Sequence, residues 1–235
     1  MVDLLAEAFT VICFDHRGTG FTPGTEGQYL TRLFAADALT LLASLGYESA
    51  HVVGHSMGGR VAQWMALDRP AAVRSLVLAS SGPGRFHRSQ TVVTGIPVKQ
   101  ALGLIDKGYQ RYLDEHIRAT FFTAKGGRSA EADWLVNAHW THRPSIEEYL
   151  KHIAARQAHR TTDLLARIQQ RTLVLVGDCD THVGGTGSHL EQSRYLAAHI
   201  PFAQYREMAG LSHGYFWEAI DVSVASVKDW LGATR

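Results

Sequence analysis

One short motif, Gly-His-Ser-Met-Gly at residues 54–58, constrains the fold of this chain more than any other part of its sequence. Residues 51–53 before it predict a strand, and residues 57–68 after it predict a helix. A serine in so tight a turn is forced toward an unfavourable backbone conformation, which glycines two residues to either side would accommodate. We therefore predict that Ser56 is exposed at the carboxyl edge of a parallel sheet; an ordinary glycine turn with a spectator serine explains this placement less well.

Short apolar runs alternate with longer helical patterns along much of the chain, which is typical of a mostly parallel sheet flanked by helices. Strands are predicted at residues 10–14, 51–53, 75–79, 172–176 and 202–207. Helices are predicted at residues 30–45, 57–68 and about 216–231. The predicted fold class is therefore α/β.

Residues 85–170 interrupt this alternation, because they contain amphipathic helical patterns and no good strand candidate. We expect them to form a helical cap inserted into a core made of residues 1–84 and 171–235. The aromatic side chains of this region include Trp134 and Trp140, which are candidates for substrate binding. Aromatic side chains in such a region more often form the packing core of the cap than a wall of the substrate site.

Two loops downstream carry an acid and a base. Serine alone is a poor nucleophile, so both groups are expected somewhere in the chain. The sequence Gly-Asp-Cys-Asp at 177–180 follows one predicted strand, and Gly-Leu-Ser-His-Gly at 210–214 follows the next. Because the carboxyl ends of parallel strands meet at one edge of a sheet, both loops are expected to lie beside Ser56.

The choice of acid and base within these loops rests on position. Asp180 is preferred over Asp178, which abuts the strand end and is better suited to tie the loop together. Among 13 histidines, His213 is the one that follows the last strand in a glycine-flanked loop. His189 and His199 lie at the two ends of a predicted helix, so we interpret them as surface or capping residues.

With these residues together, the chain resembles the α/β-hydrolase family over essentially its whole length. The matching features are Asp-His-Arg-Gly-Thr-Gly at 15–20 and the motifs at 54–58, 177–180 and 210–213. The resemblance implies a catalytic triad of Ser56, His213 and Asp180, with the Met57 N–H in the oxyanion hole. Serine at position 56 argues against the haloalkane dehalogenase and epoxide hydrolase branches. The chain is most similar to esterases and lactonases such as 3-oxoadipate enol-lactonase and aminoacrylate hydrolase.

One feature of the family is missing from the sequence. Such proteins open with two strands and a third that ends in a His-Gly-type loop, which supplies an oxyanion-hole N–H. Here a predicted helix at 2–9 passes directly into 10–14. We expect either a gap in the middle of the sheet or direct pairing of 10–14 with 51–53. The sequence would then be an N-terminally incomplete version of a longer hydrolase, or a natural short form with a rebuilt or weakened site.

Composition excludes several classes of protein. With 23 Lys+Arg against 22 Asp+Glu, the net charge of +1 provides no field for nucleic acid. No apolar run approaches the ~20 residues that cross a bilayer, and the acidic N-terminus does not suit a signal peptide. Cys13 and Cys179 form neither a disulfide framework nor a metal-ligand spacing. We expect a soluble, cytoplasmic protein without metal or cofactor. A homodimer is compatible with the sequence.

Charge is unevenly distributed, since residues 85–170 contain 13 Lys+Arg and 8 Asp+Glu, a net charge of +5. A basic cap above a serine site would suit a substrate that carries a carboxylate, which arginine can hold through two hydrogen bonds. Solvated helix faces explain the same count without any function.

The sequence as a whole predicts a serine hydrolase that cleaves a small carboxylic ester or lactone through an acyl-enzyme on Ser56. His213 would act as general base and then acid, and Asp180 would fix the imidazole tautomer. The alternatives are a carbon–carbon bond hydrolase of the same fold and a catalytically silent protein that binds a small molecule.

Overall fold

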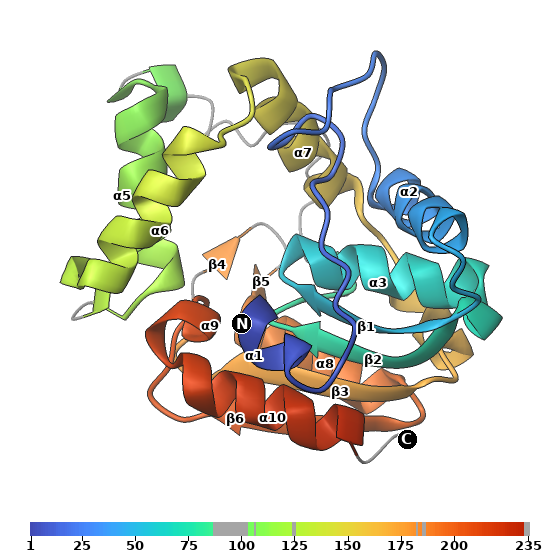
Figure 1. The fold of residues 1–235 in the computed structure, drawn as a ribbon. Coiled ribbons are helices and arrows are strands. Elements are labelled where there is room, and N and C mark those ends of the chain that lie inside the picture. Colours follow the sequence, from blue (N-terminus) through green and yellow to red (C-terminus); the bar gives the residue numbers. More distant parts are fainter. Residues whose placement is uncertain (87–102, 106, 124–125, 182, 185–186, 233–235) are drawn as a thin grey trace.

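The structure is a computed structural model that describes residues 1–86, 103–105, 107–123, 126–181, 183–184 and 187–232. Its centre is a parallel sheet of four strands in the order β1-β2-β3-β6 (Figure 1). The strands are β1 (Ala50–His55), β2 (Val73–Ala79), β3 (Arg171–Gly177) and β6 (Ala203–Met208). Because all neighbouring pairs are parallel, the four carboxyl ends lie at one edge of the sheet.

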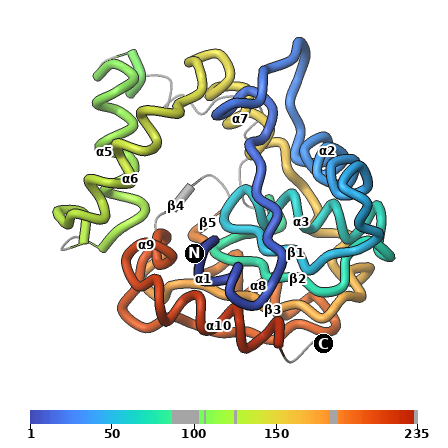
Figure 2. Tube along the Cα trace, viewed as in Figure 1, coloured from blue at the N-terminus to red at the C-terminus, as the bar shows by residue number. Residues whose placement is uncertain are grey.

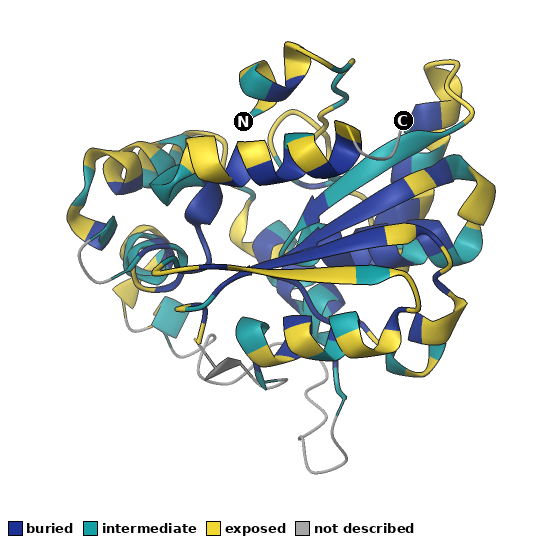
Figure 3. Ribbon diagram, turned by 90° about the horizontal axis from the view of Figure 1, so that it is seen from below, coloured by how far each residue is buried: buried dark blue, intermediate teal, exposed yellow. Residues whose placement is uncertain are grey.

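Alternation along the central strands gives the sheet two buried faces. In β2, Leu76 and Leu78 point into one apolar cluster while Val77 points into the other. The register pairs Val77 with Leu173 of β3, so their side chains share a face. A strand that is apolar on both faces requires helices on both sides, and that is what the structure shows (Figure 3).

The helices divide between the two faces of the sheet. The first cluster is covered by α2 (Thr31–Ser44), α3 (Met57–Asp68) and α8 (His189–His199). The second is covered by α1 (Val2–Ala6) and α10 (Ile220–Gly232), with the single turn α9 (Tyr215–Glu218) beside them. The remaining short elements are η1 (Pro70–Ala72), η2 (Gly126–Arg128), η3 (Thr162–Arg167), β4 (Val183–Gly184) and β5 (Gly187–Ser188). No helix in the described ranges is long and apolar enough to span a membrane.

Three helices lie between β2 and β3 in the chain: α5 (Tyr109–Phe121), α6 (Ala130–Thr141) and α7 (Ile146–Ala158). Figure 2 shows α5 beside α6, whereas α7 lies over α2 and α3. Leu113 and Ile153 belong to a small apolar cluster that is separate from the two clusters of the sheet. The helical character expected for 85–170 is present in its described part, and residues 87–102 lie outside the described residues. The division into core and cap stays a prediction.

The strand predicted at residues 10–14 is wrong. This segment is irregular, and it pairs with no described strand. Val11 packs against the cluster beneath the sheet, while Phe14 is 42% exposed. Apolar β-branched residues favour a strand only where a neighbouring backbone supplies hydrogen bonds, and here β1 bonds to β2 alone among the described strands. Direct pairing of 10–14 with β1 is therefore also wrong.

Candidate active site

Ser56 occupies the sharp turn between β1 and α3. Its backbone has φ of 54° and ψ of −115°, a conformation that residues with a Cβ rarely adopt. Such strain persists only where surrounding contacts fix it. Here the Ser56 N–H donates to Ala79 O at 2.8 Å, and Ser81 Oγ donates to Ser56 O at 2.8 Å. The end of β2 therefore holds the strained residue in place.

The glycines around Ser56 are not equally necessary. A Cβ on Gly54 would lie 2.4 Å from Gly58 O, so no larger residue fits there. A Cβ on Gly58 would meet no atom within 4 Å, so the predicted need for a glycine at this position is wrong. The close approach is instead at Gly59, where a Cβ would lie 2.5 Å from the side chain of Ser81.

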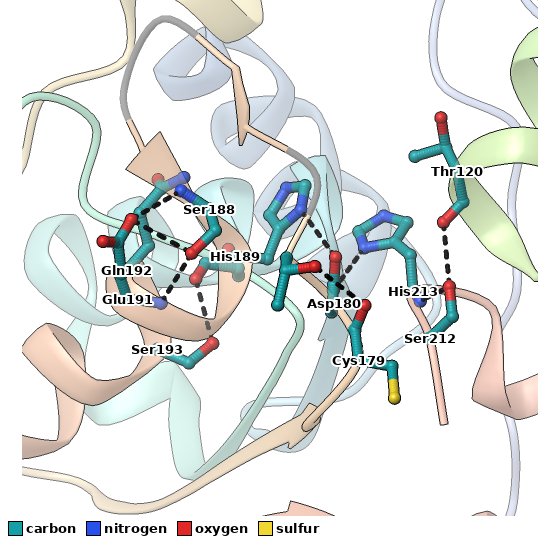
Figure 4. Close-up of polar contacts among 12 residues, drawn as sticks. Thr120, Cys179, Asp180, Ser188, His189, Glu191, Gln192, Ser193, Ser212 and His213 are labelled. Carbon is teal, nitrogen blue, oxygen red and sulfur yellow. Dashed lines mark hydrogen bonds and ion pairs between the residues drawn. The ribbon is translucent and has the colours of Figure 1, made fainter. Parts of the chain in front are cut away.

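Asp180 and His213 meet at the carboxyl edge of the sheet, as predicted (Figure 4). Asp180 follows β3 and His213 follows β6, and both are almost fully buried, at 1% and 2% exposure. His213 Nδ1 donates to Asp180 Oδ2 at 2.8 Å. This bond fixes the ring tautomer and leaves Nε2 with a free lone pair, because Nε2 has no hydrogen-bond partner among the described residues.

Contacts from several elements hold the loop of His213. His55, the last residue of β1, donates from Nε2 to His213 O at 2.8 Å. At the end of α5, Phe121 O accepts from Gly214 N at 2.5 Å, and the Phe121 ring lies edge-on to the imidazole at 5.0 Å. A Cβ on Gly214 would lie 2.2 Å from Phe121 O, so glycine is required for this contact. The position of the imidazole thus depends on the helices between β2 and β3.

His189 is part of the same cluster, and its interpretation as a surface or capping residue is wrong. It is the first residue of α8, where Ser188 and Glu191 form a capping box. His189 Nδ1 donates to Asp180 Oδ1 at 3.2 Å, and its ring stacks on that of His213 with centroids 4.3 Å apart. Asp180 therefore bridges two imidazoles, one on each carboxylate oxygen (Figure 4).

The electrostatics of this cluster favour a neutral imidazole beside an ionised acid. Burial, followed by repulsion from His189, lowers the pKa of His213 to about 4. Burial raises the pKa of Asp180, but hydrogen bonds from His189 and His213 outweigh it and hold that pKa well below its usual range. Burial also lowers the pKa of His55 to about 3, with repulsion from His213 second. His213 can therefore accept a proton at neutral pH.

The hydroxyl of Ser56 is not hydrogen-bonded to His213 in this structure, and no other described residue bonds to it either. The two sites are linked through neighbouring atoms: His55 precedes Ser56, and its ring lies 4.7 Å from that of His213. Met57 is the first residue of α3, so its N–H has no carbonyl partner one turn earlier within the helix. The structure thus joins Asp180 to His213 directly and Ser56 to them through His55.

The structure also shows where the other three residues considered from sequence lie. Asp178 Oδ1 accepts from Gly210 N at 2.8 Å, which confirms its role in tying the loops together. Trp134 is 62% exposed on α6. Trp140 packs among aromatic side chains of α5 and α7, with the Arg143 guanidinium 3.9 Å from its ring centroid. The predicted role of Trp134 and Trp140 in substrate binding stays a prediction.

Two cavities in the described part of the molecule border residues discussed above. One of about 360 Å³ borders Asp180, Cys179 and Ser212, on the side of the cluster that faces the end of α5. The other, of about 630 Å³, lies between α5 and α6 and is bordered by Trp140. Ser56 borders neither of these two cavities.

Asp180, His189 and His213 could also hold a metal ion, because one ligand atom from each lies within 4.8 Å of the others. Both Nδ1 atoms are already hydrogen-bonded to the carboxylate. An ion bound through the two Nδ1 atoms would replace those two hydrogen bonds.

Sequence reasoning missed His55 and His189. His55 lies inside the serine motif, but its neighbours in the motif say nothing about a ring that reaches the loop of His213. A signal for His189 was present, since Ser188 and Glu191 have the spacing of a capping box that starts a helix at residue 189. A helix that starts at residue 189, nine residues after Asp180, begins close to the edge of the sheet and so places the His189 ring there.

Comparisons with known proteins agree with the architecture. A family model described as alpha/beta hydrolase fold matches residues 1–219. A protein from Pseudomonas savastanoi pv. phaseolicola (strain 1448A / Race 6) named as a carbamate hydrolase, RutD, is 32% identical over 199 residues. That match covers 83% of this chain and 72% of the relative.

The solved structures with a similar fold include an enol-lactonase and a dienoate hydrolase. The enol-lactonase from Burkholderia xenovorans LB400 has a TM-score of 0.82 at 24% identity, covering 98% of this chain and 84% of that one. The 2-hydroxy-6-oxo-6-phenylhexa-2,4-dienoate hydrolase from Rhodococcus sp. strain RHA1 has a TM-score of 0.75 at 19% identity, covering 97% and 82%. At these identities the likeness establishes the shared fold.

Proposed function

The chain belongs to the α/β-hydrolase fold family, and on that basis we propose that it is a serine hydrolase that cleaves a small carboxylic ester or lactone. The observation that carries the proposal is the buried Asp180–His213 hydrogen bond at the same sheet edge as the strained Ser56. An imidazole held in one tautomer, with Nε2 unpartnered among the described residues, is the form that a general base requires.

In the first half of the reaction, Ser56 Oγ attacks the carbonyl carbon of the substrate while His213 Nε2 takes the hydroxyl proton. The tetrahedral intermediate collapses, the bond to the leaving oxygen breaks, and His213 returns the proton to that oxygen. Asp180 stabilises the imidazolium through the 2.8 Å bond to Nδ1. The alcohol departs, or stays attached to the acyl group when the substrate is a lactone.

In the second half, water attacks the acyl-enzyme and His213 Nε2 takes its proton. As this intermediate collapses, the bond between the acyl carbon and Ser56 Oγ breaks, His213 returns the proton to Oγ, and the carboxylic acid departs. In this proposal the N–H of Met57, at the start of α3, donates to the developing oxyanion. This cycle requires Ser56 Oγ and His213 Nε2 to come within hydrogen-bond distance, which is the geometric demand that the proposal makes of the protein.

The test is ester hydrolysis with 4-nitrophenyl acetate. We expect turnover that falls at least about 10⁴-fold in Ser56→Ala, because the acyl group then has no attachment site. The control is Ser44→Ala, which removes an exposed hydroxyl bonded only to Leu41 O and leaves the rate unchanged. Equal rates for Ser56→Ala and the unaltered protein would show that any hydrolysis proceeds without Ser56 and refute the acyl-enzyme.

A carbamate is the second candidate substrate, because the relative at 32% identity is named as a carbamate hydrolase. The same serine and base would attack a carbamate carbonyl, so the two candidates share residues and differ in the leaving group. Comparison of kcat/KM for an ester and a carbamate with the same acyl-side substituent decides between them. Absence of turnover for both, together with no covalent labelling of Ser56 by a fluorophosphonate, would favour the silent binding protein.

A further inference from the structure

Two guanidinium groups, those of Arg60 and Arg156, have no carboxylate partner among the described residues. Arg60 of α3 is 4% exposed, and it donates from Nη1 to Arg156 O at 2.5 Å and from Nη2 to Gln192 Oε1 at 3.2 Å. Both acceptors are neutral. The Arg156 side chain, in the last turn of α7, is partly buried and has neither a hydrogen bond nor an ion pair with any described residue.

The two arginines and the histidines belong to one electrostatic group. The positive charge of Arg156 helps to lower the pKa of His213 and of His189, although burial is the main cause for both. Burial lowers the pKa of Arg60 to about 9, with repulsion from Arg156 second. The geometry links the same elements, because Arg60 bonds both to the carbonyl of Arg156 at the end of α7 and to Gln192 of α8, three residues after His189.

The charges of this group do not balance. Arg60 and Arg156 contribute two positive charges, the imidazoles are neutral at pH 7, and Asp180 contributes one negative charge whose two oxygens are already bonded to imidazoles. Charges removed from water are normally paired, because an unpaired one is strongly disfavoured. A group left with a net charge of +1, and with an unused guanidinium fork, is suited to receive an anion from outside the chain.

We propose that Arg156 binds a carboxylate of the substrate, so that the hydrolysed ester or lactone is an acid as well as an acyl donor. This rests on the proposed function. The planar fork of Arg156 would hold the carboxylate through two N–H donors, and Arg60, anchored to Arg156 O, would support the end of α7. The scissile carbonyl would then lie between this anchor and Ser56.

The experiment compares two 4-nitrophenyl esters of straight-chain six-carbon acids, one ending in a methyl group and one in a carboxylate. For each variant the ratio of kcat/KM for the anionic ester to that for the neutral ester is measured, after subtraction of enzyme-free hydrolysis. We expect Arg156→Gln to lower this ratio by about 10- to 100-fold, the range for a charge-assisted pair of hydrogen bonds. Arg156→Lys keeps the charge but lacks the planar fork, so its ratio should lie between those of the unaltered protein and of Arg156→Gln.

The matched control is Arg160→Gln, which removes the same charge two residues beyond α7. Arg160 is 64% exposed and pairs with Asp163, so the ratio should change less than twofold. An unchanged ratio in Arg156→Gln, or an equal fall in both variants, would overturn the proposal. If Ser56→Ala removes hydrolysis of both esters while Arg156→Gln leaves the ratio unaltered, only the anion site is wrong.

A binding measurement keeps the proposal testable if neither ester is hydrolysed. Hexanedioate is titrated against the unaltered protein and against Arg156→Gln, with the shift in Tm as the readout. A Tm increase that is lost in Arg156→Gln and kept in Arg160→Gln supports the site. Equal increases in all three proteins, or no increase in any, contradict it.

Discussion

The turn around Ser56 and the loop around His213 lie at the same edge of the sheet but are held in different ways. The turn is fixed by its own glycines and by the end of the adjoining strand β2. The loop is fixed by β1, by the end of α5 and by Asp180, which are far from it in sequence. The comparison teaches that the nucleophile is specified locally, whereas the base depends on how distant helices pack.

The largest expected effect is the loss of turnover when Asp180, which holds the His213 loop, is replaced. Asp180→Asn removes the negative charge beside Nδ1 and disturbs the tautomer, so kcat should fall by about 10³- to 10⁴-fold. Asp178→Asn is the matched control, since it weakens the bond to Gly210 N without changing a group bonded to His213, and it should cost less than about fivefold. Steady-state kinetics on an ester measure both. A larger loss in Asp178→Asn would move the catalytic acid to the other aspartate.

The second prediction concerns the turn around Ser56, which is held by residues close to it in sequence. Gly54→Ala places a Cβ 2.4 Å from Gly58 O and should lower the free energy of unfolding by about 3 kcal/mol. Gly58→Ala meets open space within α3 and should raise it by about 0.5–1 kcal/mol through helix propensity. Urea unfolding followed by circular dichroism measures the difference. Equal destabilisation would show that both glycines are needed, as the motif alone suggested.

The third prediction tests the second imidazole on Asp180. His189→Ala leaves Oδ1 without its donor, and we expect kcat/KM to fall about tenfold. His189→Asn restores an N–H donor near the position of Nδ1 and should recover most of this loss. Both variants remove the repulsion that lowers the pKa of His213, so the acidic limb of the pH–rate profile, centred near pH 4 in the unaltered protein, should move upward. An unmoved limb in both variants would mean that His189 has no electrostatic role.

The fourth prediction concerns the dependence of stability on pH. The pKa values of His213, His55 and His16 are lowered to about 4, 3 and 4, mainly by burial, against an ordinary value of 6.5. Between pH 6.5 and 4 the unfolded chain therefore binds more protons than the native one. Stability should be full above pH 6.5 and decline as the pH falls through this range. Urea midpoints at pH 7.5, 5.5 and 4.5 measure the trend, and a flat series would contradict it.

Much of the fold follows from the sequence because its signals are local. The helix predicted at 57–68 has the same bounds as α3, and four of the five predicted strands are present with ends within two residues. The fifth, 10–14, failed because a strand needs a partner backbone, which its own residues cannot reveal. The pairing of Asp180 with His213 was predictable from loop order, but the stacked His189 and the contact from His55 depend on packing between distant elements.

The central claim is that Ser56 and His213 act as one unit although the structure does not join them by a hydrogen bond. The most direct measurement is the rate at which a fluorophosphonate labels Ser56, followed by intact mass and peptide mapping. The account predicts labelling at Ser56 that slows at least about 100-fold in His213→Ala, because the base no longer removes the hydroxyl proton. Labelling at the same rate in both proteins, or at another residue, would contradict it.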